Sequence, residues 1–253
     1  MKLTFLGTGA ADWPTKPAEN AFHRYLSSLL IDDTLLVDAG PCVPDAAKKY
    51  ADLARVENIL VTHSHSDHFS AKTLEWLAEG GKKTVWLTAP AAKLVPQSEN
   101  LTVCEVIPFV PFPCGEYRVT AVAGNHSTGI PEEQPVHYII ERDGKTVYYG
   151  LDGAWMINRS FHELQKHTFD AMVFDCTAGD RPGEWRLFEH NTIPMLRYML
   201  DTMRAAYPQM FGENCRLIAS HMARTLHGSH EELMDRLAEF GMEAAYDGWT
   251  LTV

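Results

Sequence analysis

Long hydrophobic runs are missing from this sequence. The first apolar stretch, residues 3–6, is cut by Gly7, which makes it too short for the hydrophobic region of a secretory signal. No later stretch approaches the roughly 20 apolar residues of a membrane-spanning helix. We therefore expect a soluble protein that does not associate with membranes and that resides in the cytoplasm.

Cysteine is also sparse and shows no pairing pattern. The five cysteines include no C-x-x-C pair and are widely scattered: Cys42, Cys104, Cys114, Cys176 and Cys215. An odd, scattered set favours neither a disulfide framework nor a cysteine zinc site. We expect the cysteines to be ordinary small apolar residues, as is typical of a protein in a reducing compartment.

Positive charge is in short supply. The 22 lysines and arginines are outnumbered by 33 aspartates and glutamates, so the formal net charge is −11. Such a balance opposes sequence-independent binding to a polyanion, and we expect no general nucleic-acid binding. The formal charge does not exclude a local cationic pocket, because bound divalent metals are not included in it.

The residues that are present predict one α/β domain over residues 1–253. Its 45% hydrophobic residues can supply a sizeable core. Turn residues at Asp32-Asp33 and Asp143-Gly144 predict two hairpins, so the sheet is expected to be partly antiparallel. Short apolar runs predict strands at residues 3–6, 28–31, 35–37, 59–61, 84–87, 118–123, 136–140, 146–149, 171–174, 217–219 and 249–253.

Spaced apolar residues predict the helices. Ser229 and Glu232 have the spacing of a capping box, Gly241 can end that helix, and Ser70 is a second candidate N-cap. The proline-rich residues 108–113 predict a surface loop. The predicted helices span residues 45–55, 71–78, 155–166, 192–206 and 230–240.

One short segment has the composition of a metal site. Directly after a predicted strand come His63, His65, Asp67 and His68, which place three imidazoles and one carboxylate within six residues. Such close spacing has little packing rationale. Imidazole with carboxylate suits zinc, manganese or iron, and no cysteine lies nearby to make a thiolate site.

Three distant residues share this placement at the ends of strands. His126 follows the predicted strand 118–123, Asp152 follows 146–149, and His221 follows 217–219. Each alone is typical of an ordinary hydrogen-bonded residue. Strand ends gathered at one edge would bring these side chains together, so their shared position predicts further metal ligands.

At this point the chain resembles the metallo-β-lactamase superfamily, whose hallmark is His-x-His-x-Asp-His. The resemblance implies a four-layer αβ/βα sandwich with mixed sheets, and two divalent metal ions, zinc or manganese first and iron as a further candidate. It also implies the ligands. His63, His65 and His126 would bind one metal, Asp67, His68 and His221 the other, and Asp152 would bridge them.

Further segments resemble the ribonuclease Z and cyclic phosphodiesterase branch of that superfamily. Gly7-Thr8-Gly9 follows the first strand, and Asn125-His126-Ser127 and Glu189-His190-Asn191 resemble segments of the phosphodiesterase that opens a ribosyl cyclic phosphate. That relative has a cysteine-rich zinc segment, whereas residues 10–40 contain no cysteine here. The pocket wall, and with it the substrate, is therefore expected to differ. An insertion like the transfer-RNA-binding arm of ribonuclease Z is not evident.

The resemblance implies a phosphodiesterase that hydrolyses a small cyclic or nucleotide-like phosphodiester with a metal-bridging hydroxide. Three alternatives stay open: a lactone or thioester hydrolase of the same fold, a ribonuclease that processes transfer RNA, and a non-catalytic metal-binding accessory protein. The expected partner is a small anionic substrate, and a homodimer is left open.

A leaving alkoxide needs a proton, and His190 is the main candidate to donate it. With Asn191 as N-cap and Pro194 in the first turn, His190 would lie beside a helix N-terminus that lowers its pKa. His227 is the second candidate, or else a residue that orients a ligand, and Asp67 is counted with the catalytic residues as well as the ligands. The spacing of five further histidines gives them no site: His23, His137, His162, His167 and His230.

Overall fold

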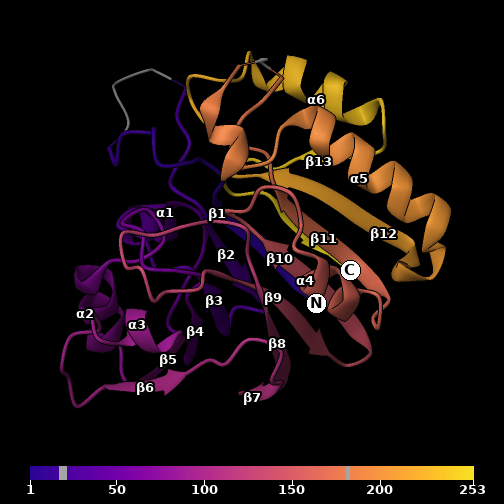
Figure 1. Cartoon of the computed structure of the whole chain (residues 1–253). Coiled ribbons are helices and arrows are strands. Elements are labelled where there is room, and N and C mark those ends of the chain that lie inside the picture. The colour runs from indigo at the N-terminus through magenta and orange to yellow at the C-terminus, as the bar shows by residue number, and fades with distance from the viewer. Residues whose placement is uncertain (17–21, 181–182) are drawn as a thin grey trace. The chain divides into compact units, whose positions relative to one another are not determined.

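Two compact units, each built on one seven-stranded sheet, make up the described part of the chain, residues 1–16, 22–180 and 183–253 of this computed structural model (Figure 1). The first unit comprises Met1–Ile107, Ser127–Pro135 and Tyr246–Thr252. The second comprises Pro108–His126, Val136–Ala245 and Val253. The single domain predicted over residues 1–253 stays a prediction.

The sheet of the first unit is mixed, as the hairpin at Asp32 and Asp33 predicts. Both residues adopt the left-handed backbone conformation, with φ of 50° and 61°, as the tight turn between β2 and β3 requires. The pairs β14–β1–β2–β3 are antiparallel, and β3–β4–β5–β6 are parallel. The strands are β1 (Lys2–Gly7), β2 (Ser28–Ile31), β3 (Leu35–Val37), β4 (Asn58–Leu60), β5 (Lys83–Leu87), β6 (Leu101–Glu105) and β14 (Thr250–Thr252).

Three helices contribute to the core of the first unit: α1 (Val43–Tyr50), α2 (Ala71–Glu79) and α3 (Ala89–Ala92). Ala46, Leu74 and Ala91 from these helices are buried in one cluster with strand residues such as Ile59 and Val85. Ser70 caps α2 as predicted, since its side chain accepts a hydrogen bond from the Thr73 amide.

The sheet of the second unit repeats this mixture. The pairs β7–β8–β9–β10 are antiparallel, with Asp143 and Gly144 at the predicted hairpin, and β10–β11–β12–β13 are parallel. The two mixed sheets confirm the predicted α/β class. The strands are β7 (Phe112–Cys114), β8 (Tyr117–Ala123), β9 (Val136–Arg142), β10 (Lys145–Gly150), β11 (Phe169–Asp175), β12 (Phe211–Ser220) and β13 (Glu243–Ala244).

Helices α5 and α6 lie along strands β11 to β13 of the second unit (Figure 1). Leu196 and Leu200 of α5 and Leu233 and Leu237 of α6 are buried in one cluster with the sheet. None of the helices in the described residues is long and apolar enough to cross a membrane. The helical elements are α4 (Asn158–Leu164), α5 (Ile193–Ala206) and α6 (His230–Ala238), with 3₁₀ turns η1 (Trp185–Phe188) and η2 (Pro208–Met210).

Several predicted boundaries were wrong. The helix predicted over residues 45–55 is Val43–Tyr50, because Ala51 is fully extended at φ −158°. The helix predicted from residue 155 begins at Asn158. Residues 108–113 are not all loop, because β7 starts at Phe112. Strands β6, β7 and β13 were missed; β13 has two residues and β6 is half-exposed, so neither shows a clear apolar pattern.

Loss of the α6 cap should lower stability. Ser229 Oγ accepts from the Glu232 amide at 3.2 Å, and Glu232 Oε2 accepts from the Ser229 amide at 2.8 Å. Ser229→Ala removes the acceptor and should lower the free energy of unfolding by about 1 kcal/mol, measured by urea denaturation. Ser229→Asn keeps an acceptor and should stay within a few tenths of a kcal/mol of the parent. Equal losses in both variants would contradict the capping account.

Candidate metal centre

The His-x-His-x-Asp-His motif lies between β4 and α2 of the first unit. The chain turns tightly after the strand, because the amides of His68 and Phe69 both donate to the carbonyl of His65. The amide of Ser70 then donates to Ala39 O, and α2 begins. The motif thus occupies a short turn that is hydrogen-bonded at its end to the residues after β3.

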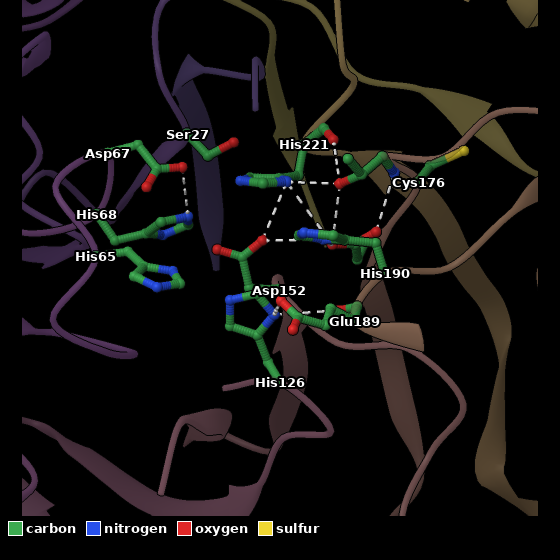
Figure 2. Close-up of polar contacts among 12 residues, drawn as sticks. Ser27, His65, Asp67, His68, His126, Asp152, Cys176, Glu189, His190 and His221 are labelled. Carbon is green, nitrogen blue, oxygen red and sulfur yellow. Dashed lines mark hydrogen bonds and ion pairs between the residues drawn. The ribbon is translucent and has the colours of Figure 1, made fainter. Parts of the chain in front are cut away.

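Within this turn the predicted ligands converge. His63 Nε2 lies 3.0 Å from His65 Nδ1. His68 Nε2 lies 3.4 Å from Asp67 Oδ2 (Figure 2). The ring centroids of His63 and His68 are 4.5 Å apart. His63, Asp67 and His68 are buried. Imidazoles this close, with a carboxylate beside them, form the kind of donor set that binds a transition metal.

Asp38 orients two of these histidines, and the sequence analysis missed it. Its Oδ2 accepts from His68 Nδ1 at 2.7 Å, and its Oδ1 accepts from the amide and hydroxyl of Thr62 at 2.8 and 2.9 Å. Thr62 Oγ1 in turn lies 3.0 Å from His63 Nδ1. Because both Nδ1 atoms are engaged, the Nε2 atoms are the ones presented as ligands.

Two further residues fix the turn. A Cβ at Gly40 would lie 2.0 Å from the carbonyl oxygen of Asp67, so this close approach of two backbones requires glycine. Glu133 Oε1 accepts from the Ser64 amide at 2.9 Å, and its Oε2 accepts from the Ser64 hydroxyl. Backbone contacts and a buried carboxylate thus hold the turn on both sides.

In the second unit the remaining predicted ligands follow strand ends, as expected. His126 comes after β8, Asp152 after β10 and His221 after β12. Asp152 and His221 adopt left-handed backbone conformations, with φ of 56° and 60°. Non-glycine residues rarely do so, at a cost of roughly 1–3 kcal/mol each, and such residues cluster at functional sites.

Asp152 and His221 gather with Asp175 and His190 into a second cluster, whose ligand atoms all lie within 4.8 Å of one another. Asp152 Oδ1 lies 3.2 Å from Nδ1 of both histidines (Figure 2). The rings of His190 and His221 are stacked with centroids 5.7 Å apart. His190, predicted as the acid, therefore lies among the predicted ligands of its unit.

Asp175 organises this cluster in the way that Asp38 organises the first, and it too was missed. Its oxygens accept from the amide and hydroxyl of Thr177 at 2.9 and 3.1 Å and from His190 Nδ1 at 2.8 Å. Thr177 Oγ1 lies 2.7 Å from His221 Nδ1. Asp38 and Asp175 both stand at strand ends, so the pattern that identified His126 and His221 could have found them.

Two predictions about His190 were wrong. The N-cap of α5 is Thr192, not Asn191, because the hydroxyl of Thr192 accepts from the Met195 amide at 3.2 Å. The pKa of His190 is not lowered. Burial lowers it, but the carboxylates of Asp175 and Asp152 outweigh burial and raise the pKa to about 9. Pro194 does lie in the first turn of α5, as predicted.

The other two predicted residues of the second unit occupy different surroundings. His126 Nδ1 donates to Glu189 O at 3.2 Å, and its ring centroid lies 5.0 Å from that of His190. His227 Nε2 donates to the carbonyl of Cys176 at 2.7 Å, next to Asp175. The structure thus brings His126 to His190, whereas the catalytic role of His227 stays a prediction.

Comparison with known proteins agrees with this chemistry. A family model described as the Beta-lactamase superfamily domain matches residues 33–222. No curated protein matches the sequence. One similar solved structure is the metallo-beta-lactamase fold protein YhfI from Bacillus subtilis, with 18% identity, 99% of this chain and 98% of that chain covered, and a TM-score of 0.73.

Two further structures cover all of this chain with a TM-score of 0.71. Zinc-bound PqqB from Methylobacterium extorquens is 18% identical and is covered over 100% of its length. A diphosphatase from the PhnP family is 16% identical and is covered over 97%. At these identities the likeness shows the fold, and it confirms the predicted fold class.

Removing the charge of Asp38 should weaken metal binding. In Asp38→Asn the new NH2 group replaces one of the two carboxylate oxygens and cannot accept a hydrogen bond. Either His68 or Thr62 therefore loses its acceptor. Loss of such outer partners typically weakens metal affinity 10–100-fold, and we expect a loss of that size in zinc competition titrations. Asp32→Asn, at the hairpin of the same sheet, is the control and should bind zinc like the parent. Unchanged zinc affinity in Asp38→Asn would show that Asp38 does not support metal binding.

Proposed function

Because the chain belongs to the beta-lactamase superfamily, we propose that it is a metal-dependent phosphodiesterase acting on a small cyclic or nucleotide-like phosphodiester. Its fold and its relatives are those of metal-dependent hydrolases. The observation that carries the finer proposal is the position of His190 among the ligands of the second unit, bonded to two carboxylates.

The proposed ligands are those that the family motif implies. Their side chains converge within each unit, and their Nδ1 contacts leave the Nε2 atoms of His63 and His68 to serve as ligands. Zinc or manganese suits this donor set, with iron as a further candidate. One metal would be held by His63, His65 and His126, the other by Asp67, His68 and His221, with Asp152 shared.

When bound in such a set, two divalent ions would lower the pKa of a bound water and stabilise developing negative charge. The buried aspartates Asp38, Asp67, Asp152 and Asp175 would balance the formal charge of two such ions, so the attraction for a substrate would come from the open coordination positions of the ions. An anionic oxygen binds at such a position, and a phosphodiester supplies one. The net charge of −11 for the whole chain favours a small substrate over a nucleic acid.

His190 would protonate the leaving oxygen. Its Nδ1–H donates to Asp175 Oδ2 at 2.8 Å, which fixes the ring and leaves Nε2 as the atom that can deliver a proton. An alkoxide leaving group is strongly basic and needs that proton, whereas a thiolate, with a pKa of about 8.5, needs it much less. An oriented acid therefore favours phosphodiester cleavage over thioester hydrolysis.

Two of the similar structures support this proposal. One similar structure is that of a diphosphatase of the PhnP family, and another is that of zinc-bound PqqB. The first fits phosphoryl-transfer chemistry, and the second fits a zinc-type site. The expected location of the activity is the cytoplasm.

The basicity of the leaving group tests the role of His190. In zinc- or manganese-loaded protein, His190→Gln should lower kcat for a 2′,3′-cyclic nucleotide, which has an alkoxide leaving group, by about 10²–10⁴-fold. Hydrolysis of bis-p-nitrophenyl phosphate, whose leaving group needs little protonation, should fall far less. Metal content, measured by mass spectrometry, should stay unchanged.

His162→Gln is the matched control, since His162 is exposed on α4 and bonded to Gln165. It should leave both reactions unchanged. Equal losses on the two substrates in His190→Gln would contradict its role as the acid. Turnover of lactones or thioesters with none of any phosphodiester would overturn the phosphodiesterase assignment itself.

A further inference from the structure

We infer that His137 and Tyr148 form a buried support that holds the backbone of Asp152 in the conformation needed for metal binding. The inference rests on the proposed function insofar as Asp152 binds metal. No role was predicted for His137, because its position inside β9 has no metal-ligand spacing. In the structure it connects β10 to the turn that carries Asp152.

Two hydrogen bonds define this support. His137 Nε2 lies 3.1 Å from the carbonyl oxygen of Asp152, and His137 Nδ1 lies 2.8 Å from the hydroxyl of Tyr148. The carbonyl can only accept, so Nε2 carries the proton and Nδ1 accepts from Tyr148. The tyrosine hydroxyl, by donating to Nδ1, stabilises the tautomer of His137 that donates to Asp152.

Both groups are buried. His137 is 7% exposed and Tyr148 is 2% exposed. Burial raises the pKa of Tyr148, so the phenol keeps its proton and can donate it to His137. The hydrogen-bonding pattern is therefore fixed in one direction.

Three glycines make room for the support. A Cβ at Gly153 would lie 2.6 Å from His137 Cε1, and one at Gly124 would lie 2.9 Å from His137 Nε2. A Cβ at Gly150 would lie 2.3 Å from the hydroxyl of Tyr148. Each distance is shorter than real Cβ contacts, so any side chain there would displace the two rings. The absence of a side chain at these three positions therefore leaves the space that the two rings occupy.

The backbone of Asp152 needs such support. Its φ of 56° is unfavourable for a residue with a side chain, and without an anchored carbonyl the turn can relax toward ordinary conformations. Asn125 secures the next residues, since its carbonyl accepts from the Ala154 amide at 3.0 Å and its Nδ2 donates to Trp155 O at 2.9 Å. His126 directly follows Asn125, so the turns that carry His126 and Asp152 are tied together.

Tyr148→Phe tests this inference, because phenylalanine keeps the packing against Phe169 and Phe174 but cannot donate to His137. In metal-free protein, the amides of residues 152–155 should exchange with solvent at least tenfold faster than in the parent. Zinc affinity in competition titrations should fall 10–100-fold, the range seen when outer partners of metal ligands are lost. Neither readout depends on the substrate.

Tyr117→Phe is the matched control, since Tyr117 is 4% exposed and its hydroxyl contacts Arg142 in the same unit. It should leave exchange and zinc affinity unchanged. His137→Gln can still donate to the Asp152 carbonyl and should bind zinc more tightly than His137→Leu, which cannot. This rescue separates hydrogen bonding from packing.

Parent-like exchange and zinc affinity in Tyr148→Phe would overturn the inference. Equal zinc affinities in His137→Gln and His137→Leu would overturn it as well. This second test also applies if Tyr148→Phe fails to fold. If zinc binding depends on the support as expected while no phosphodiester is hydrolysed, the inference stands and the proposed substrate class fails.

Discussion

Buried aspartates that orient histidines are the interaction on which the rest of the candidate site depends. Asp38 and Asp175 are both fully buried, and each accepts from the amide and hydroxyl of a threonine and from the Nδ1 of a histidine. Each threonine hydroxyl also contacts a second histidine, His63 or His221. The same Asp–Thr–His arrangement thus recurs in both units. A buried carboxylate would be unfavourable without these donors, so the site and the fold around it stabilise each other.

Backbone strain also occurs at these clusters. Asp38, Asp152 and His221 are non-glycine residues with left-handed backbone conformations, and all three belong to the clusters described above. Glycines lie nearby where there is no room for a Cβ atom, as at Gly40 next to Asp67 and at Gly153 next to His137. Such conformations persist where surrounding contacts fix them. The hydrogen bonds of Thr62, Thr177 and His137 are contacts of this kind, and they link local strain to the geometry of the donor atoms.

Much of the fold and of the donor set followed from local sequence patterns. The hairpins at Asp32 and Asp143, the caps at Ser70 and Ser229, and the strand-end positions of His126 and His221 all depend on a few neighbouring residues. The prediction of Asn191 as N-cap was wrong by one residue, because the neighbouring Thr192 also has a hydroxyl that can cap and it accepts from the Met195 amide. The predicted lowering of the His190 pKa failed because no local pattern shows the two carboxylates beside it. His137 was passed over for the same reason: its partners lie 11 and 15 residues away.

The number of metal ions per chain tests the account most directly. Native mass spectrometry of the zinc-loaded protein should show two ions bound to each chain. Asp152→Ser should lose at least one of them, because Asp152 is proposed to bind both ions. A chain that binds no zinc, or that binds the same number of ions with and without the Asp152 carboxylate, would contradict the proposed centre.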